Sequence, residues 1–250
     1  MSRWPAFVPE RRAIIKKTNL GQDHHSRGKS SAATHQAMKV LVLGASGGVG
    51  KHLVRLACDR GHIVTALVRR ADGIDSRARI LIDDVLRPGC FDEHVRGHEV
   101  VLSALGNKRT NPANLWSALA SPPDFSVRTA AMLVNAMRQH GLARVIAVSA
   151  AGVADSAARM NLLMKYLVAK SNIGIAYRDL AAMERVLADS GLDWCCPRPT
   201  RLTRGPLTRR VKLVESFPMT AGISRADVAW WMLEHAAQPI RERTPMISGG

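Results

Sequence analysis

The feature that most constrains the fold is an apolar run that leads through three spaced glycines into a helical pattern. It reads Lys39-Val-Leu-Val-Leu-Gly44-Ala-Ser-Gly47-Gly-Val-Gly50-Lys-His-Leu-Val54. Gly44 permits a tight turn, Gly47 lets the backbone approach a pyrophosphate, and Gly50 lets the helix pack closely on the strand. Phosphates would accept hydrogen bonds from N–H groups at the positive end of this helix. The segment predicts a dinucleotide-binding turn with contacts from Gly44, Ser46, Gly47, Gly48, Val49 and Gly50.

A P-loop is the competing interpretation of this segment, because Lys51 directly follows Gly50. That motif also requires an earlier glycine at a fixed distance and a serine or threonine after the lysine, which holds magnesium. Ala45 and His52 occupy these two positions. The residues therefore exclude a P-loop.

Short apolar runs alternate with longer helical patterns from Met38 onward. The expected helices span 51–60, 124–140 and one long region, 159–190, and the expected strands span 40–43, 63–68, 79–82, 100–104, 144–149 and 192–196. Such alternation indicates βαβ units and a parallel sheet. We therefore expect an α/β fold, namely a single Rossmann-type domain with a doubly wound parallel sheet over residues 38–250.

The C-terminal part is less regular, and we expect it to carry the substrate loops. Near its end, Ser224 and Asp227 precede an apolar run in a pattern close to a capping box, which indicates a helix start. An earlier loop-like segment contains five basic residues: Arg201, Arg204, Arg209, Arg210 and Lys212. These residues are candidates for binding an acidic substrate.

Residues 1–37 differ from the rest of the chain, with seven Lys and Arg residues against two acidic ones. No apolar period is sustained across them. We expect a disordered basic extension. Met38 directly precedes the first expected strand and is an alternative translation start, which would make residues 1–37 an artefact.

The formal net charge of +16 attracts polyanions, but it does not choose among nucleic acid, anionic membrane and a phosphorylated small molecule. No recognised nucleic-acid-binding motif is present, so we expect a small-molecule substrate and no nucleic-acid partner. No apolar run reaches the roughly 20 residues of a membrane span, and no secretory signal is visible. We expect a cytoplasmic protein that is a monomer or a weakly associating homo-oligomer.

The four cysteines, Cys58, Cys90, Cys195 and Cys196, show no metal-ligand spacing. They are expected to be reduced, buried thiols. No metal site is expected.

The end of the second expected strand indicates which dinucleotide is bound. An NAD-preferring site usually has Asp or Glu there, which hydrogen-bonds the ribose 2′-hydroxyl. This chain has Val68-Arg69-Arg70. A guanidinium binds a 2′-phosphate that an acid would repel. We expect NADP as the cofactor, bound by Arg69, with Arg70 as a helper or a surface residue.

An ordered set of further segments resembles a known family. They are Leu67-Val68-Arg69, Asp83-Asp84-Val85, Ser103-Ala104-Leu105-Gly106, Val148-Ser149-Ala150, Ser190-Gly191-Leu192-Asp193-Trp194 and Arg198-Pro199. Together with the glycine turn they resemble the atypical short-chain dehydrogenases/reductases with an NAD(P)H-binding domain. The likeness is strongest to the flavin reductase/biliverdin-IXβ reductase branch, and it covers nearly all of residues 38–250.

The resemblance implies roles for residues at the carboxyl ends of strands. Asp84 and Val85 would lie against the adenine, and Ser149 would face the nicotinamide. The segment 197–200, which begins with Pro197, would close over the nicotinamide side. The pyrophosphate and the nicotinamide ribose would be lined by Ala104, Leu105 and Gly106.

A catalytic dyad is a further hypothesis. Many short-chain dehydrogenases pair an upstream serine with Tyr-x-x-x-Lys, in which tyrosine donates a proton and lysine lowers its pKa. This chain offers Ser149, Tyr166 and Lys170, although the gap between Ser149 and Tyr166 is longer than usual. The branch it resembles carries no such dyad, and Tyr166 also fits an ordinary amphipathic helix. Asp179 and Glu184 are interpreted as surface or supporting groups.

The favoured function is an NADPH-dependent oxidoreductase that transfers hydride to a conjugated acceptor such as a flavin, a quinone or a tetrapyrrole. One alternative is a non-enzymatic NADP-binding protein that regulates partners or aids assembly. Another is an enzyme similar to sugar epimerases or dehydratases, which would need the Tyr166 and Lys170 pair. The sequence does not choose the acceptor.

Overall fold

A computed structural model describes residues 36–111 and 113–250 of the chain, so nearly all of the expected basic extension lies outside the described residues. The central sheet has six parallel strands in the order β3-β2-β1-β4-β5-β6. Their bounds are Lys39–Leu43 (β1), Ile63–Val68 (β2), Arg79–Ile82 (β3), Val100–Ser103 (β4), Arg144–Ala147 (β5) and Asp193–Cys195 (β6). The doubly wound Rossmann fold expected from the sequence is confirmed.

Strand β1 is the centre of this sheet. Val40 pairs with Val64 of β2 on one side and with Val100 of β4 on the other. The chain winds outward from β1 through β2 and β3, and then returns to wind the other way through β4, β5 and β6. Ligands of open α/β sheets bind at the carboxyl ends of the strands where this reversal occurs.

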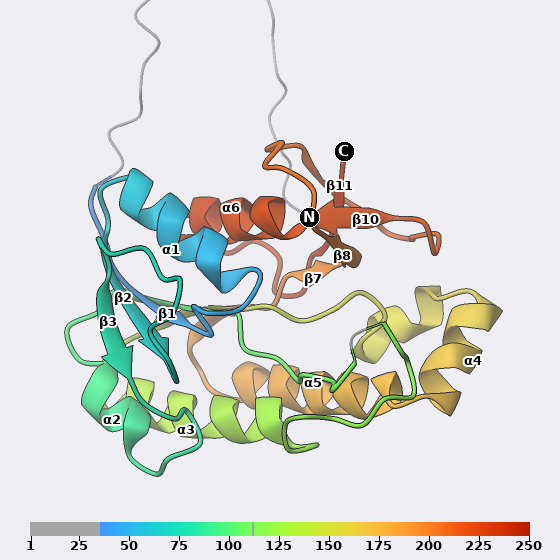
Figure 1. Cartoon of the computed structure of the whole chain (residues 1–250), viewed down its shortest axis with the longest axis horizontal. Helices are drawn as coiled ribbons and strands as arrows, with labels where there is room; N and C mark the ends of the chain where they lie inside the picture. Colours follow the sequence, from blue (N-terminus) through green and yellow to red (C-terminus); the bar gives the residue numbers. More distant parts are fainter. Residues whose placement is uncertain (1–35, 112) are drawn as a thin grey trace, which may run out of the picture. The chain divides into compact units, whose positions relative to one another are not determined.

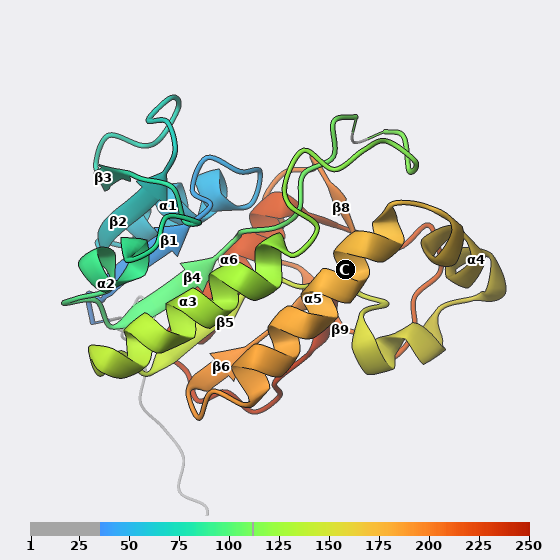
Figure 2. The same cartoon turned by 90° about the horizontal axis from the view of Figure 1, so that it is seen from below.

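Helices cover both faces of the sheet, as Figure 1 shows. Val40 and Val42 of β1 belong to the core beneath α1 (Gly50–Asp59) and α6 (Arg225–Ala236). Leu41 and Leu43 belong to the opposite core. Figure 2 shows α3 (Phe125–Gln139) and α5 (Ile173–Ala188) side by side on that second face, with the short α2 (Cys90–His94) beside them. Because both faces are covered, the central strands β1, β2 and β4 are mainly apolar and do not alternate.

The helical region expected over residues 159–190 is interrupted. A 3-10 helix, η1 (Ala154–Arg159), is followed by α4 (Leu162–Lys170) and then by α5. Between α4 and α5, Asn172 donates from its side chain to the carbonyl oxygens of Trp116 and Ser117, at 2.8 and 3.1 Å. Asparagine and serine compete for backbone groups in this way, so they favour helix ends over helix interiors.

The segment 201–212, expected to be a loop, contributes to two small sheets. β8 (Arg201–Thr203) pairs with β10 (Gly222–Ser224), and β9 (Val211–Leu213) joins β7 (Arg198–Pro199) through β11 (Met246–Gly249). The expected helix start at Ser224 is confirmed, because its hydroxyl accepts a hydrogen bond from the amide of Asp227 at 2.9 Å. No helix in the described residues is long and apolar enough to cross a membrane.

The position of β1 between two cores predicts a large effect of truncating one side chain. Leu41 is fully buried, so Leu41→Ala should lower the free energy of unfolding by about 3 kcal/mol, through lost burial and the cavity left behind. Leu162→Ala is the matched control, because Leu162 is 84% exposed. Urea unfolding measures both variants, and equal effects would contradict this account of the core.

Candidate functional site

The glycine turn joins β1 to α1 with no room for side chains at two of its positions. Gly44 has a φ of +70°, and a Cβ there would lie 2.8 Å from the carbonyl oxygen of Ala104. A Cβ at Gly50 would lie 2.2 Å from the carbonyl oxygen of Gly44. The tight turn at Gly44 and the close helix packing at Gly50 are therefore confirmed as structural roles.

The beginning of α1 is open to an anion. Its N-cap residue, Val49, provides no side-chain hydrogen bond, and the first turn holds no acidic residue. The first N–H groups of a helix have no acceptor within the helix, and they carry the positive end of its dipole. The turn therefore presents N–H donors and positive potential where a phosphate group would bind.

A cleft runs along the carboxyl ends of β1 to β4 beside this turn. The space within it is about 810 Å³ when its open mouth is included. The structure brings ten of the predicted cofactor contacts together along this cleft and its cationic end. They are Gly44, Ser46, Gly47, Arg69, Arg70, Asp84, Val85, Ala104, Leu105 and Gly106. Of these, only Arg70 lies at the cationic end alone. Gly48, Val49 and Gly50 follow the turn, at the start of α1.

The end of the cleft beyond Ser46 is rich in cations. Arg69 and Arg70 line it together with Lys51 and Lys108, and Asp72 is its acidic member. Lys51 extends from α1 toward the loop after β2, where its Nζ lies 3.0 Å from the position of a Cβ at Gly73. Sequence reasoning missed both lysines, because Lys51 was considered only as part of a P-loop and Lys108 follows the matched Ala104–Gly106 segment.

Ser149 lies just beyond β5 and is only 5% exposed. Its amide donates to the carbonyl oxygen of Pro197 at 2.9 Å, so these two predicted nicotinamide contacts are neighbours. Its buried hydroxyl has no hydrogen-bond partner within the described residues. Buried hydroxyls are normally paired, so this unpaired one is a candidate for binding a ligand.

Tyr166 and Lys170 lie on α4, which has no buried residue, and Tyr166 is 61% exposed. The backbone oxygen of Lys170 accepts a hydrogen bond from the Trp116 indole at 3.0 Å. Ser149, by contrast, is buried. The structure thus places the tyrosine of the predicted dyad in solvent, and its catalytic role stays a prediction.

A second tyrosine, Tyr177 of α5, is the one that reaches the segment after β5. Its hydroxyl donates to the carbonyl oxygen of Ala151 at 3.1 Å, and burial raises its pKa. Ala181 stands four positions later, so no lysine faces this phenol from the next turn. Tyr177 therefore braces the backbone near Ser149.

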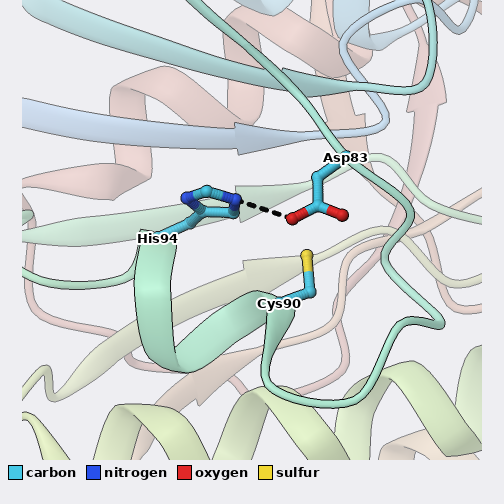
Figure 3. Close-up of side chains that lie close together, drawn as sticks. All are labelled: Asp83, Cys90 and His94. Atoms are coloured by element: carbon cyan, nitrogen blue, oxygen red, sulfur yellow. Dashed lines mark hydrogen bonds and ion pairs between the residues drawn. The ribbon is translucent and has the colours of Figure 1, made fainter.

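Asp83, which lines the cleft, lies beside Cys90 and His94 (Figure 3). A carboxylate oxygen, the thiol sulfur and an imidazole nitrogen of these residues lie within 4.8 Å of one another. Asp83 accepts from His94 at 2.9 Å, and the Arg87 guanidinium donates to both of its carboxylate oxygens. This guanidinium holds the pKa of Asp83 well below its usual range. Burial and the nearby carboxylate raise the pKa of the Cys90 thiol to about 12.

The positive charge of Arg87 is therefore already paired with the Asp83 carboxylate. These contacts hold the loop after β3 in place. The amide of Asp84 donates to Asp83 at 2.7 Å, which orients Asp84 along the cleft. All four cysteines are free thiols, and Cys58 alone is not fully buried. The four residues are therefore thiols, as expected, but the expected burial fails for Cys58, which is only partly buried.

Asp179 and Glu184, which were expected to be surface or supporting groups, are not at the surface, because each is 5% exposed. Asp179 accepts from the amides of Ser126 and Val127 at the start of α3, and from the Asn107 side chain at 2.6 Å. It therefore fixes the loop after β4 against α3. This contact fits the supporting role that the sequence also allowed for Asp179.

Glu184 forms a buried bidentate pair with Arg198, with N···O distances of 2.9 and 2.7 Å. The third guanidinium nitrogen of Arg198 reaches Asp155 of η1 at 2.8 Å. Arg198 directly follows Pro197, the neighbour of Ser149, and is itself 3% exposed. This pair links α5 to the nicotinamide side of the predicted site.

Comparison with known families identifies the chain. Residues 44–239 match the model of an NAD(P)H-binding family, so the protein belongs to that family. The resemblance predicted from the sequence is thereby confirmed at the level of the family.

Two curated relatives match shorter segments. A 3-diazoavenalumate denitrifying reductase of a Streptomyces species is 35% identical over 126 residues, which are 46% of this chain and 38% of that protein. A fatty acid hydroxylase of Mycosarcoma maydis is 35% identical over 80 residues, 28% of this chain and 27% of that protein. The matches thus span well under half the length of either relative.

Solved structures with this fold include the anaerobilin reductase ChuY of Escherichia coli O157:H7. Its TM-score is 0.66 at 22% identity, over 84% of this chain and 96% of that one. A short-chain dehydrogenase/reductase of Veillonella parvula in complex with NADP has a TM-score of 0.67 at 20% identity, over 85% and 94%. These likenesses establish the Rossmann fold of the chain.

The buried pair behind the site yields a stability prediction. Glu184→Gln should lower the free energy of unfolding by about 3 kcal/mol, because the buried Arg198 charge loses its buried carboxylate and keeps only the exposed Asp155 as a partner. Glu215→Gln is the matched control, because Glu215 is exposed. Chemical unfolding followed by circular dichroism compares the two, and a Glu184 variant as stable as the control would refute the buried-pair account.

Proposed function

We propose that the protein is an NADPH-dependent reductase that transfers hydride to a conjugated acceptor such as a flavin, a quinone or a tetrapyrrole. The observation that carries the proposal is the cationic end of the cleft, where Arg69, Lys51 and Lys108 surround Ser46 beside the glycine turn. The names of two similar proteins, a denitrifying reductase and an anaerobilin reductase, support reduction as the reaction class.

The preference for NADP rests on charge. NAD-preferring sites place an acid at the end of β2, where this chain has Arg69 and Arg70. A 2′-phosphate adds negative charge that Arg69 can bind with two parallel N–H donors, and Lys51 and Lys108 add two further positive charges. Asp72 is the acidic residue at this cationic end of the cleft, and the four cations there leave that end with a net positive charge.

The cofactor would supply the hydride. The protein's residues would bind and orient the cofactor and the acceptor, and would exclude water from them. The Ser149 hydroxyl, buried and unpartnered within the described residues, would bind the nicotinamide carboxamide or the acceptor. Asp179 and Glu184 hold the loop after β4 and the segment at Pro197 in place around it. Tyr166 is exposed to solvent, so water would supply the proton that balances hydride transfer.

An epimerase- or dehydratase-like reaction is the second enzymatic candidate. It requires Tyr166 and Lys170 to close over Ser149, and the exposure of Tyr166 weighs against it. A non-enzymatic NADP-binding role requires only the cleft. These alternatives differ from the reductase in what they predict for turnover.

Charge reversal at Arg69 tests the cofactor preference. Arg69→Asp should weaken NADPH binding about tenfold or more, because charged hydrogen bonds to the 2′-phosphate are lost, and should leave NADH binding little changed. Arg96→Asp, an exposed arginine outside the cleft, is the control. Calorimetric titration of both cofactors measures the effect, and an unchanged NADPH/NADH ratio would remove Arg69 from the site.

Turnover tests the reaction. NADPH absorbance should fall when the protein is mixed with members of a panel of flavins, quinones and tetrapyrroles, and Tyr166→Phe should keep the wild-type rate. Tight NADPH binding without oxidation by any acceptor would favour the non-enzymatic role. Loss of activity in Tyr166→Phe, with NADPH affinity kept, would instead favour the dyad.

A further inference from the structure

An arginine from the far end of the chain covers the glycine turn. A Cβ built on Gly48 would lie 2.5 Å from Cδ and 2.8 Å from Nε of Arg225, and its three nearest heavy atoms all belong to that side chain. Gly48 has no positive φ, so its backbone does not require glycine. Arg225 therefore fills the space that a side chain at position 48 would occupy.

Arg225 is held in this position by its own backbone and by one hydrogen bond. It is the first residue of α6, directly after the N-cap Ser224. Its Nη1 donates to the carbonyl oxygen of Thr203 at 2.9 Å, and the residue is half-buried. Within the described part of the chain, Arg225 has no carboxylate partner.

A guanidinium without a carboxylate partner keeps N–H donors available for an anion. Gly48 lies between the turn and the open N-terminus of α1, where backbone N–H groups would bind phosphate oxygens. Burial, and then the charges of Arg55 and Arg225, lower the pKa of His52 on α1. The surroundings of Gly48 are thus positive, and no acidic residue stands in the first turn of α1 to offset them.

We propose that Arg225 binds the pyrophosphate of the cofactor from above the glycine turn, and that glycine is needed at position 48 to admit it. This inference rests on the proposed dinucleotide function and adds a residue to it. Because the pyrophosphate is common to NADPH and NADH, Arg225 contributes affinity for both cofactors and no preference between them. Arg69, at the other end of the cleft, contributes the preference.

Ligand fragments separate these two arginines. Arg225→Gln should weaken NADPH and NADH equally, by about tenfold, as expected for charged hydrogen bonds. It should leave unchanged the binding of adenosine 2′-monophosphate, which lacks the pyrophosphate. Arg69→Asp should weaken adenosine 2′-monophosphate and NADPH but spare NADH. Arg241→Gln, an exposed arginine after α6, is the matched control and should change none of these affinities.

Gly48→Ala tests the contact between Gly48 and Arg225 without changing Arg225. The added methyl group should displace the arginine and weaken both dinucleotides as much as Arg225→Gln does. The double variant should bind no more weakly than Arg225→Gln alone, because both changes remove one interaction. Thermal unfolding of each variant shows whether the fold is kept.

The outcomes distinguish the inference from the function on which it rests. Wild-type protein that binds neither NADPH nor NADH overturns both. Wild-type binding that Arg225→Gln leaves unchanged overturns the role of Arg225 alone, as does an equal loss of adenosine 2′-monophosphate binding. Selective loss of the two dinucleotides supports it, and additive losses in the double variant would show that Gly48 acts independently of Arg225.

Discussion

The contact between the end of β1 and the start of α1 is the constraint on which the rest of the structure depends. Position 50 lies so close to the carbonyl oxygen of Gly44 that only a hydrogen fits between them, and Gly44 adopts a left-handed conformation against Ala104 of the neighbouring strand. This contact aims the N-terminus of α1 along the carboxyl edge of the sheet. The reversal of winding at β1 and β4 places the cleft at that same edge.

Two buried carboxylates on α5 hold the segments that follow β4 and β6. Asp179 accepts amides at the start of α3 and orients the Asn107 loop, and Glu184 neutralises Arg198 next to Pro197. One helix thus positions the segments after β4 and β6 relative to each other. The site is therefore built on elements of the core, which favours a rigid, preorganised cleft.

The cations near the glycine turn form two groups, to which we assign different parts of the cofactor. Arg69, Lys51 and Lys108 gather where a 2′-phosphate would bind, and Arg225 covers the turn where a pyrophosphate would bind. The basic residues at Arg201–Lys212, which the sequence made prominent, lie instead mostly exposed around two short strands. Arg69, Lys51 and Lys108 are exposed as well, so what distinguishes them is their place around the cleft at the carboxyl ends of the strands.

The sequence by itself determined the fold class, the six central strands and the glycine turn, because each depends on local spacing and apolar pattern. It also placed Arg69 at the end of the second strand, because that position follows directly from the strand's apolar run. It did not reveal the break between α4 and α5, where Asn172 bonds the distant Trp116 and Ser117. Only the tertiary structure brought Lys51 and Lys108 to the cleft, placed Arg225 against Gly48, and buried Glu184 against Arg198. These contacts join residues far apart in the chain, and no local pattern records which surfaces will meet when the sheet forms.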